Sequence, residues 1–247
     1  MKKVIGIVGE GPTDYLVIKE VIDHISGEEN TYIRLQPEPN LEGKFGNGWK
    51  GVWKWCEDTS GILEQMFCDI IPKMDMLVIQ MDADVSRKEK EVHCLCEHNK
   101  CDNKAEVHPL ECDKIGKKEC PVVLPCESHT PSPDGYVGHL HAMILKWLGL
   151  EEEQENILIV IPCDSTDAWI VAAYEEFEDV ETIEEPWNTI IAKKKEYHEI
   201  RVPGKKKNVS VYSKFVLQLI NNWGAVRDKC QSAKNFEDDI RKALHIS

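Results

Sequence analysis

The stretch from residue 4 to residue 25 constrains the fold most, because it joins two different hydrophobic patterns through one acidic turn. Residues 4–8 (VIGIV) form a short apolar run typical of a buried strand. Apolar residues at positions 18, 21, 22 and 25 are spaced three and four apart, which predicts a helix beginning near Pro12. The turn between them, Gly9-Glu10-Gly11, lacks the lysine of a P-loop and the third glycine of a dinucleotide fingerprint. It therefore presents a carboxylate at the carboxyl end of a strand, where open α/β sheets bind ligands.

Two later apolar runs also end in acidic residues. Residues 75–81 lead directly into Asp82-Ala83-Asp84, and residues 156–162 lead into a segment that contains Asp164 and Asp167. Strands and helices are expected to alternate through residue 177, which predicts an α/β, Rossmann-like fold: a mostly parallel sheet with helices on both faces. Other expected elements are a strand at 31–35 and helices near 49–56, 61–71, 137–148, 166–177, 215–223 and 236–244.

Because parallel strands end at the same edge of a sheet, we expect the acidic residues to converge. Asp82 and Asp84 would point to the same side if the chain is still extended there. Convergent carboxylates repel one another, and a divalent cation with oxygen ligands, Mg²⁺ or Mn²⁺, would relieve the repulsion. The alternative is that these acids only cap helices and turns. For Asp164 the two interpretations weigh equally, whereas Asp167 falls inside the first turn of a helix and favours the metal.

Composition restricts the class of protein. The 247 residues are 42% hydrophobic, enough for a core, and we expect a single domain over 1–247. A net charge of -14 argues against a protein that coats nucleic acid, but an acidic nuclease is allowed because metal-binding carboxylates raise the acidic count. No apolar run reaches 18 residues, and the strand at the amino terminus leaves no room for a signal peptide. The expectation is a cytoplasmic protein without a membrane span.

Residues 86–128 differ abruptly from the rest and are expected to form an insert. They hold six cysteines and little apolar periodicity, so they cannot build a core of their own. In a chain without a secretion signal such cysteines indicate metal ligands or buried thiols, and four of them would suit a structural Zn²⁺. The alternative is a redox-active or disordered loop. The candidate zinc ligands are Cys94, Cys96, Cys101, Cys112, Cys120 and Cys126, and the spacing does not say which four bind.

The last part of the chain, residues 178–247, carries a basic segment followed by helices expected to pack on the core. Residues 193–214 contain eight basic and two acidic residues. A basic stripe opposite an acidic metal centre would suit a phosphate backbone, although a single lysine is more often only solvated. The candidate nucleic-acid-binding residues are Lys193, Lys194, Lys205, Lys206 and Lys207, and Lys195 and Lys214 lie in the same segment.

Three short motifs resemble the Toprim domain, a domain of topoisomerases, primases and nucleases of the overcoming-lysogenization-defect type. They are GEGPTD at 9–14, MDAD at 81–84 and TDAWI at 166–170, and the match is closest to small stand-alone Toprim-like proteins of bacteria. The late Tyr212-Ser213-Lys214 and the helix around Phe236 also look similar. The resemblance covers most of the chain outside 86–128. Two departures are Asp167, where glutamate is expected, and the cysteine-rich insert.

The resemblance implies metal-dependent cleavage of phosphodiesters. Glu10 would be a metal ligand or general base, Asp82 and Asp84 would be metal ligands, and Asp164 or Asp167 would serve a second ion. Lys214 is the first choice for the lysine that stabilises the developing phosphate charge. The substrate would be nucleic acid (DNA or RNA, transfer RNA included), and the implied setting is the effector of a bacterial antiviral defence system beside an ATPase partner.

Two other functions are weighed against the nuclease. One is a non-catalytic, zinc-containing module that holds nucleic acid or a protein. The other is nucleotidyl transfer, as in primases, which would require incorporation of nucleotides on a template. Metal-dependent cleavage that is lost in Glu10→Gln would favour the nuclease. The sequence leaves open a homo-oligomer.

Overall fold

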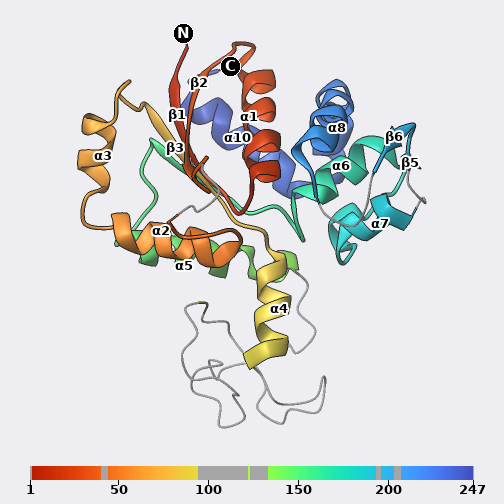
Figure 1. Cartoon of the computed structure of the whole chain (residues 1–247), viewed down its shortest axis with the longest axis horizontal. Helices are drawn as coiled ribbons and strands as arrows, with labels where there is room; N and C mark the ends of the chain where they lie inside the picture. The colour runs from red at the N-terminus through yellow and green to blue at the C-terminus, as the bar shows by residue number, and fades with distance from the viewer. Residues whose placement is uncertain are drawn as a thin grey trace.

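A computed structural model of the chain describes residues 2–39, 44–93, 122, 133–192, 196–202 and 207–246. At its centre lies a sheet of four strands in the order β2-β1-β3-β4, and every neighbouring pair is parallel (Figure 1). The strands are β1 Val4–Val8, β2 Thr31–Gln36, β3 Met76–Gln80 and β4 Ile157–Val160. The predicted parallel sheet is confirmed, and it explains why strands β1, β3 and β4 are apolar on both faces.

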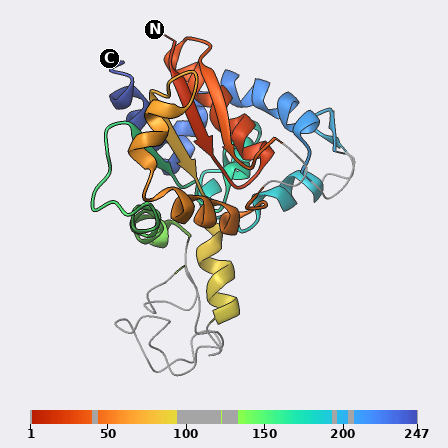
Figure 2. The same cartoon turned by 60° about the vertical axis from the view of Figure 1, so that its left-hand side comes forward.

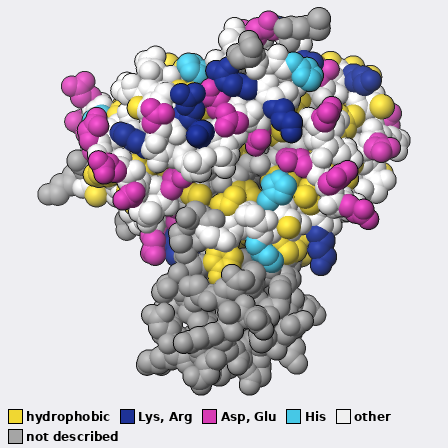
Figure 3. All heavy atoms as spheres, turned by 180° about the vertical axis from the view of Figure 1, so that it is seen from behind, with side chains coloured by type: hydrophobic (Ala, Val, Ile, Leu, Met, Phe, Trp, Pro, Cys, Tyr) yellow, Lys and Arg dark blue, Asp and Glu magenta, His cyan; other side chains and the backbone are white. Residues whose placement is uncertain are grey.

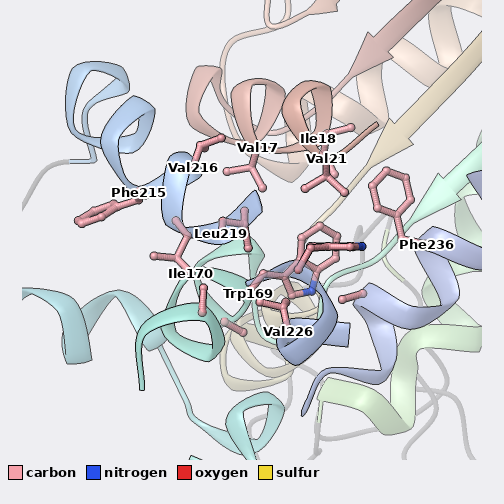
Figure 4. Close-up of a cluster of buried hydrophobic side chains, with 14 of the residues drawn as sticks. Val17, Ile18, Val21, Trp169, Ile170, Phe215, Val216, Leu219, Val226 and Phe236 are labelled. Carbon is pink, nitrogen blue, oxygen red and sulfur yellow. The ribbon is translucent and has the colours of Figure 1, made fainter. Parts of the chain in front are cut away.

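One face of the sheet is covered by five helices: α1 Pro12–Ser26, α6 Thr166–Tyr174, α8 Val209–Asn221, α9 Trp223–Lys229 and α10 Gln231–Ala243. Their apolar side chains meet in one cluster with alternate strand residues such as Met76 and Val78 (Figure 4). Trp169 is fully buried at its middle, stacked on Phe236 and edge-on to Trp223, with ring centroids 5.7 Å apart in both pairs. Burial of such aromatic rings supplies much of the driving force for this layer.

The other face is covered by α2 Trp49–Thr59, α3 Leu63–Asp69 and α5 Val137–Leu148 (Figures 1 and 2). The intervening strand residues, among them Leu77 and Ile79, point into this second cluster. Gly6 in β1 allows the side chains of Met74 and Leu35 to pack closely on the strand, and a Cβ atom at that position would force them to shift. Helices therefore lie on both faces, as the alternation of strands and helices predicts.

Helix α4, Asp84–His93, begins directly after β3 and projects from the body of the molecule (Figures 1 and 2). The expected insert therefore does not start as an irregular segment at residue 86. Ser86 is fully buried, and its hydroxyl donates to the carbonyl of Ala83, so the first turn of α4 belongs to the core. The six candidate zinc cysteines lie outside the described residues. Val122, which the structure describes between residues 94 and 128, is buried in the second hydrophobic cluster.

Several smaller elements depart from the prediction. The helix expected to reach Phe177 ends at Tyr174, and the Phe177 side chain is 42% exposed. The carboxyl-terminal stripe through Trp223 is divided between α8 and α9 at Asn222. Four short elements, all near the basic segment or the preceding loop, were not predicted because their apolar patterns are too short: η2 Val180–Thr182, α7 Pro186–Ala192, β5 Glu196–Tyr197 and β6 Ile200–Arg201. Over the parts of the chain that the structure describes, no helix combines the length and apolar character needed to cross a bilayer.

Candidate active site

Acidic side chains from five segments converge at the carboxyl edge of the sheet. Strands β1 and β3 are direct neighbours, so the residues that follow them, Glu10 and Asp82, meet across the edge. Helix α1 adds Asp14, helix α4 adds Asp84 and helix α6 adds Asp167. These five carboxylates, which influence one another electrostatically, are called the acidic centre below.

Gln80, the last residue of β3, ties Glu10 to Asp82. Its amide nitrogen donates to Asp82 Oδ1 at 2.7 Å, and its amide oxygen accepts from the Glu10 backbone N–H at 3.1 Å. The backbone N–H of Asp82 in turn donates to Glu10 Oε1 at 2.8 Å. These bonds fix one oxygen of each carboxylate and leave Glu10 Oε2 and Asp82 Oδ2 outside them. The sequence gives no signal for Gln80 beyond its place in an apolar strand.

Asp14 is a member of the site to which sequence reasoning gave no role. It is 5% exposed, and Thr166 Oγ1 donates to its Oδ1 at 2.6 Å, which joins the first turn of α1 to the first turn of α6. A Cβ atom at Gly11 would lie 3.0 Å from Asp14 Oδ2, so the glycine leaves room for this carboxylate. The usable signal was the GEGPTD motif itself, which ends at Asp14.

Asp167 is almost fully buried, at 1% exposure, and has two strong partners. Lys207 Nζ lies 2.7 Å from Asp167 Oδ2, and the hydroxyl of Tyr212 donates to Asp167 Oδ1. The lysine of the acidic centre is therefore Lys207, whose side chain is 36% exposed. Lys214, the expected catalytic lysine, is exposed on α8 and does not take part in these contacts, because it lies almost two helical turns beyond Lys207.

Asp84 and Asp164 form the outer part of the site, and here one prediction is wrong. The chain is not extended from Asp82 to Asp84, because Asp84 is the first residue of α4 and its N–H donates to the Asp164 carbonyl at 2.9 Å. Asp84 pairs with Lys88 one turn further along the helix. Asp164, in the left-handed region at φ 31°, accepts from Arg87 Nη2 at 2.7 Å. Its charge is therefore already neutralised by an arginine.

Burial and mutual repulsion make the acidic centre electrostatically unusual. Burial raises the pKa of Glu10 to about 8, and the negative charge of Asp84 adds to the effect. Burial likewise raises the pKa of Asp14 and raises that of Asp82 well above its ordinary value, in the latter case with help from Asp14 and Glu10. Burial alone would lower the pKa of Lys207, but the neighbouring carboxylates outweigh it and raise that pKa. Full ionisation of these neighbouring carboxylates is therefore unfavourable without a cation, and the raised pKa values mean that protons take up part of the charge.

The donor set suits a hard divalent cation, since every anionic side chain in it offers oxygen. Glu10 Oε2 and Asp82 Oδ2 are the oxygens left over from the hydrogen bonds with Gln80 and the backbone. Within the described ranges, however, no three His, Cys, Asp or Glu side chains are already drawn together as a metal-binding group. In this conformation two ammonium groups pair with carboxylates of the centre, Lys207 with Asp167 and Lys88 with Asp84.

The other predicted binding residues fall in parts of the chain that the structure does not describe. Lys193, Lys194, Lys205 and Lys206, like the zinc candidates Cys94, Cys96, Cys101, Cys112, Cys120 and Cys126, lie outside the described residues. On the back face of the molecule acidic and basic side chains are interspersed rather than segregated (Figure 3). That face, in its described part, does not present the broad basic surface that a nucleic-acid duplex would require.

A cavity of about 1060 Å³ lies elsewhere, beside the outer edge of β4 and against α5, α9 and α10. His141, Ile159, Arg227 and Phe236 are among its lining residues, and none of the acidic centre is. Comparison of the chain with protein-family models, with curated proteins and with solved structures finds no match.

Proposed function

We propose that this protein is a Mg²⁺- or Mn²⁺-dependent nuclease that cleaves phosphodiester bonds of nucleic acid at the acidic centre. The observation that supports the proposal is the convergence of buried carboxylates from β1, α1, β3 and α6 at one edge of a parallel sheet. Such a cluster costs stability unless a cation compensates it. The resemblance of the three acidic motifs to the Toprim domain agrees with this chemistry.

Glu10 and Asp82 would hold the divalent cation through their second oxygens, with Asp84 at the rim of the site. When bound, such an ion supplies activation of water and stabilisation of the leaving oxygen. The remaining residues orient this set: Gln80 holds Asp82, and Thr166 holds Asp14. Asp167 is fixed between Tyr212 and Lys207 and serves to position the lysine.

The test is cleavage of labelled single-stranded DNA, duplex DNA and RNA, transfer RNA included, with and without Mn²⁺. Glu10→Gln and Asp82→Asn should each reduce cleavage by at least about a hundredfold, since they remove charge at the position of the cation. Asp69→Asn, an exposed acid on α3, is the matched control and should leave cleavage unchanged. Binding of nucleic acid without cleavage in the parent would instead favour the non-catalytic module.

The wider setting stays part of the proposal: an effector in bacterial antiviral defence, with an ATPase as partner and zinc in the insert. If purified protein cleaves only when a co-expressed ATPase is present, the partner is part of the active enzyme. Incorporation of nucleotides on a primed template, in place of cleavage, would favour nucleotidyl transfer.

A further inference from the structure

We infer that the ammonium group of Lys207 is a built-in counter-cation of the acidic centre, and that a divalent cation must displace it to bind. The inference rests on the proposed metal-dependent function and concerns the regulation of the same site. It assigns to Lys207 a role different from contact with a nucleic-acid backbone. It also makes metal binding a competition between two cations for one group of carboxylates.

The ammonium of Lys207 enters the cluster through Asp167, while the side chain as a whole stays 36% exposed. Its Nζ lies 2.7 Å from Asp167 Oδ2, and Asp167 is 1% exposed. The charge of Lys207 acts on Asp14 and Asp82 as well as on Asp167. Asp14 and Asp82 are each 5% exposed. A single ammonium therefore serves carboxylates from three different elements, which is the task that a divalent cation would otherwise perform.

Asp167 holds the ammonium in this place. Its Oδ1 accepts from the Tyr212 hydroxyl, and the Ser165 hydroxyl lies 3.4 Å from its Oδ2. With the carboxylate held by Tyr212 and Ser165, it presents Oδ2 to the ammonium of Lys207. Asp167 thus anchors the lysine, which explains why a shorter acid than glutamate can serve at this position.

The backbone at Lys207 allows the side chain to leave. Lys207 precedes Asn208, the residue that caps α8 by accepting from the Ser210 N–H at 2.8 Å. Because Lys207 lies outside the helix and its side chain is 36% exposed, the ammonium can move to solvent while α8 keeps its cap. A divalent cation and the Lys207 ammonium would repel each other in this partly buried site, so binding of the one disfavours the other.

The experiment measures Mn²⁺ affinity of the full chain by electron paramagnetic resonance of the free ion. Lys207→Met removes the charge and keeps the length of the side chain, and should tighten Mn²⁺ binding by about tenfold or more. Lys214→Met, which removes an exposed charge on α8, is the matched control and should bind Mn²⁺ like the parent. Equal or weaker binding by Lys207→Met would overturn the inference.

A second measurement uses the parent protein, so it does not depend on the folding of a variant. Acetylation of Lys207 by acetic anhydride, followed by mass spectrometry, should be several times faster at saturating Mn²⁺ than without it, because displacement frees the amine. An unchanged or slower rate would contradict displacement. Lys214 provides the internal reference in the same digest.

The variant Asp82→Asn distinguishes failure of the inference on Lys207 from failure of the proposed metal site. If Mn²⁺ binds the parent and not Asp82→Asn, but Lys207→Met is no tighter and Lys207 is not released, only the inference on Lys207 fails. If the parent does not bind Mn²⁺, or Asp82→Asn binds it equally well, the proposed metal site itself fails.

Discussion

Gln80 shows how an uncharged residue positions two acidic residues, through the carboxylate of Asp82 and the backbone of Glu10. It is fully buried, and its amide donates to Asp82 while accepting from the backbone of Glu10. A side chain with only donors or only acceptors could not satisfy both partners. The position of the two acids therefore depends on a residue that takes no part in holding a cation.

Replacement of Gln80 by methionine is expected to destabilise the fold by about 1–3 kcal/mol, because Asp82 Oδ1 and the Glu10 N–H lose their partner in a buried place. Urea denaturation followed by circular dichroism measures this change. Gln65→Met on α3, where the amide contacts exposed Asp69, is the control and should change the unfolding free energy by less than about 0.5 kcal/mol. Equal effects of the two substitutions would mean that Gln80 does not hold the site together.

Glu10 gives the metal-free protein a specific dependence on pH. Its pKa is about 8 in the folded chain, chiefly through burial and then through Asp84, against an ordinary value of 4.5. Between these values the folded state keeps a proton that the unfolded state has released, so stability falls as pH rises. Unfolding free energies in EDTA should therefore decrease from pH 5 to pH 8, and Glu10→Gln should reduce that slope. A slope that Glu10→Gln leaves unchanged would assign the pH dependence to other groups.

At the scale of the element, helix α10 is held by side-chain hydrogen bonds at its first turn and again near its middle. Glu181 caps its amino-terminal turn, accepting from the N–H groups of Gln231 and Ser232 at 2.7 and 3.0 Å. Ser232 Oγ in turn accepts from Trp169 Nε1 at 2.9 Å. The helix is thereby joined to the middle of the core at its first turn, and Phe236 continues that contact one turn later.

Glu237 fixes the same helix further along and is 3% exposed. Burial would raise its pKa, but hydrogen bonds from Arg241 and Trp223, both at 2.7 Å, outweigh it and lower that pKa. Glu237→Ala should cost about 2 kcal/mol, less than a fully buried pair, because the arginine partners are partly exposed. Chemical denaturation of Glu237→Ala beside Glu176→Ala, an exposed acid, measures it. A loss of unfolding free energy no larger than that of Glu176→Ala would mean that this network does not stabilise the fold.

At the scale of the whole molecule, the sequence predicted the strands and helices whose apolar residues recur regularly along the whole element. The strands at 4–8 and 76–80 and helices α1, α2, α5 and α10 were located from such patterns, because one or both faces are buried. Helix α4 was missed since its ten residues are mostly charged, and its first turn is held by contacts with the loop after β4. Lys207 could not be distinguished from its neighbours, because only the folded chain brings it to Asp167.

The insert supports a separate prediction for the whole chain. Six cysteines in residues 86–128 predict about one Zn²⁺ per molecule, and these ligands lie outside the described residues. Elemental analysis of protein purified without added metal measures the content. A thiol-reactive dye should label the insert only after a zinc chelator is added. Protein free of zinc, with all of these thiols reactive from the start, would contradict the prediction.

Helix α4 has a mechanical consequence. Its ten residues make a rigid rod of about 15 Å that stands out from the body of the molecule (Figure 2). Its inner end is bonded into the acidic centre through the Asp84 N–H on Asp164 and through the Arg87–Asp164 pair. A change in the direction of the helix would therefore move Asp84 relative to the rest of the acidic centre. Asp164 is the residue that holds the inner end of the helix, and Asp84 is the carboxylate of the acidic centre that would move with it.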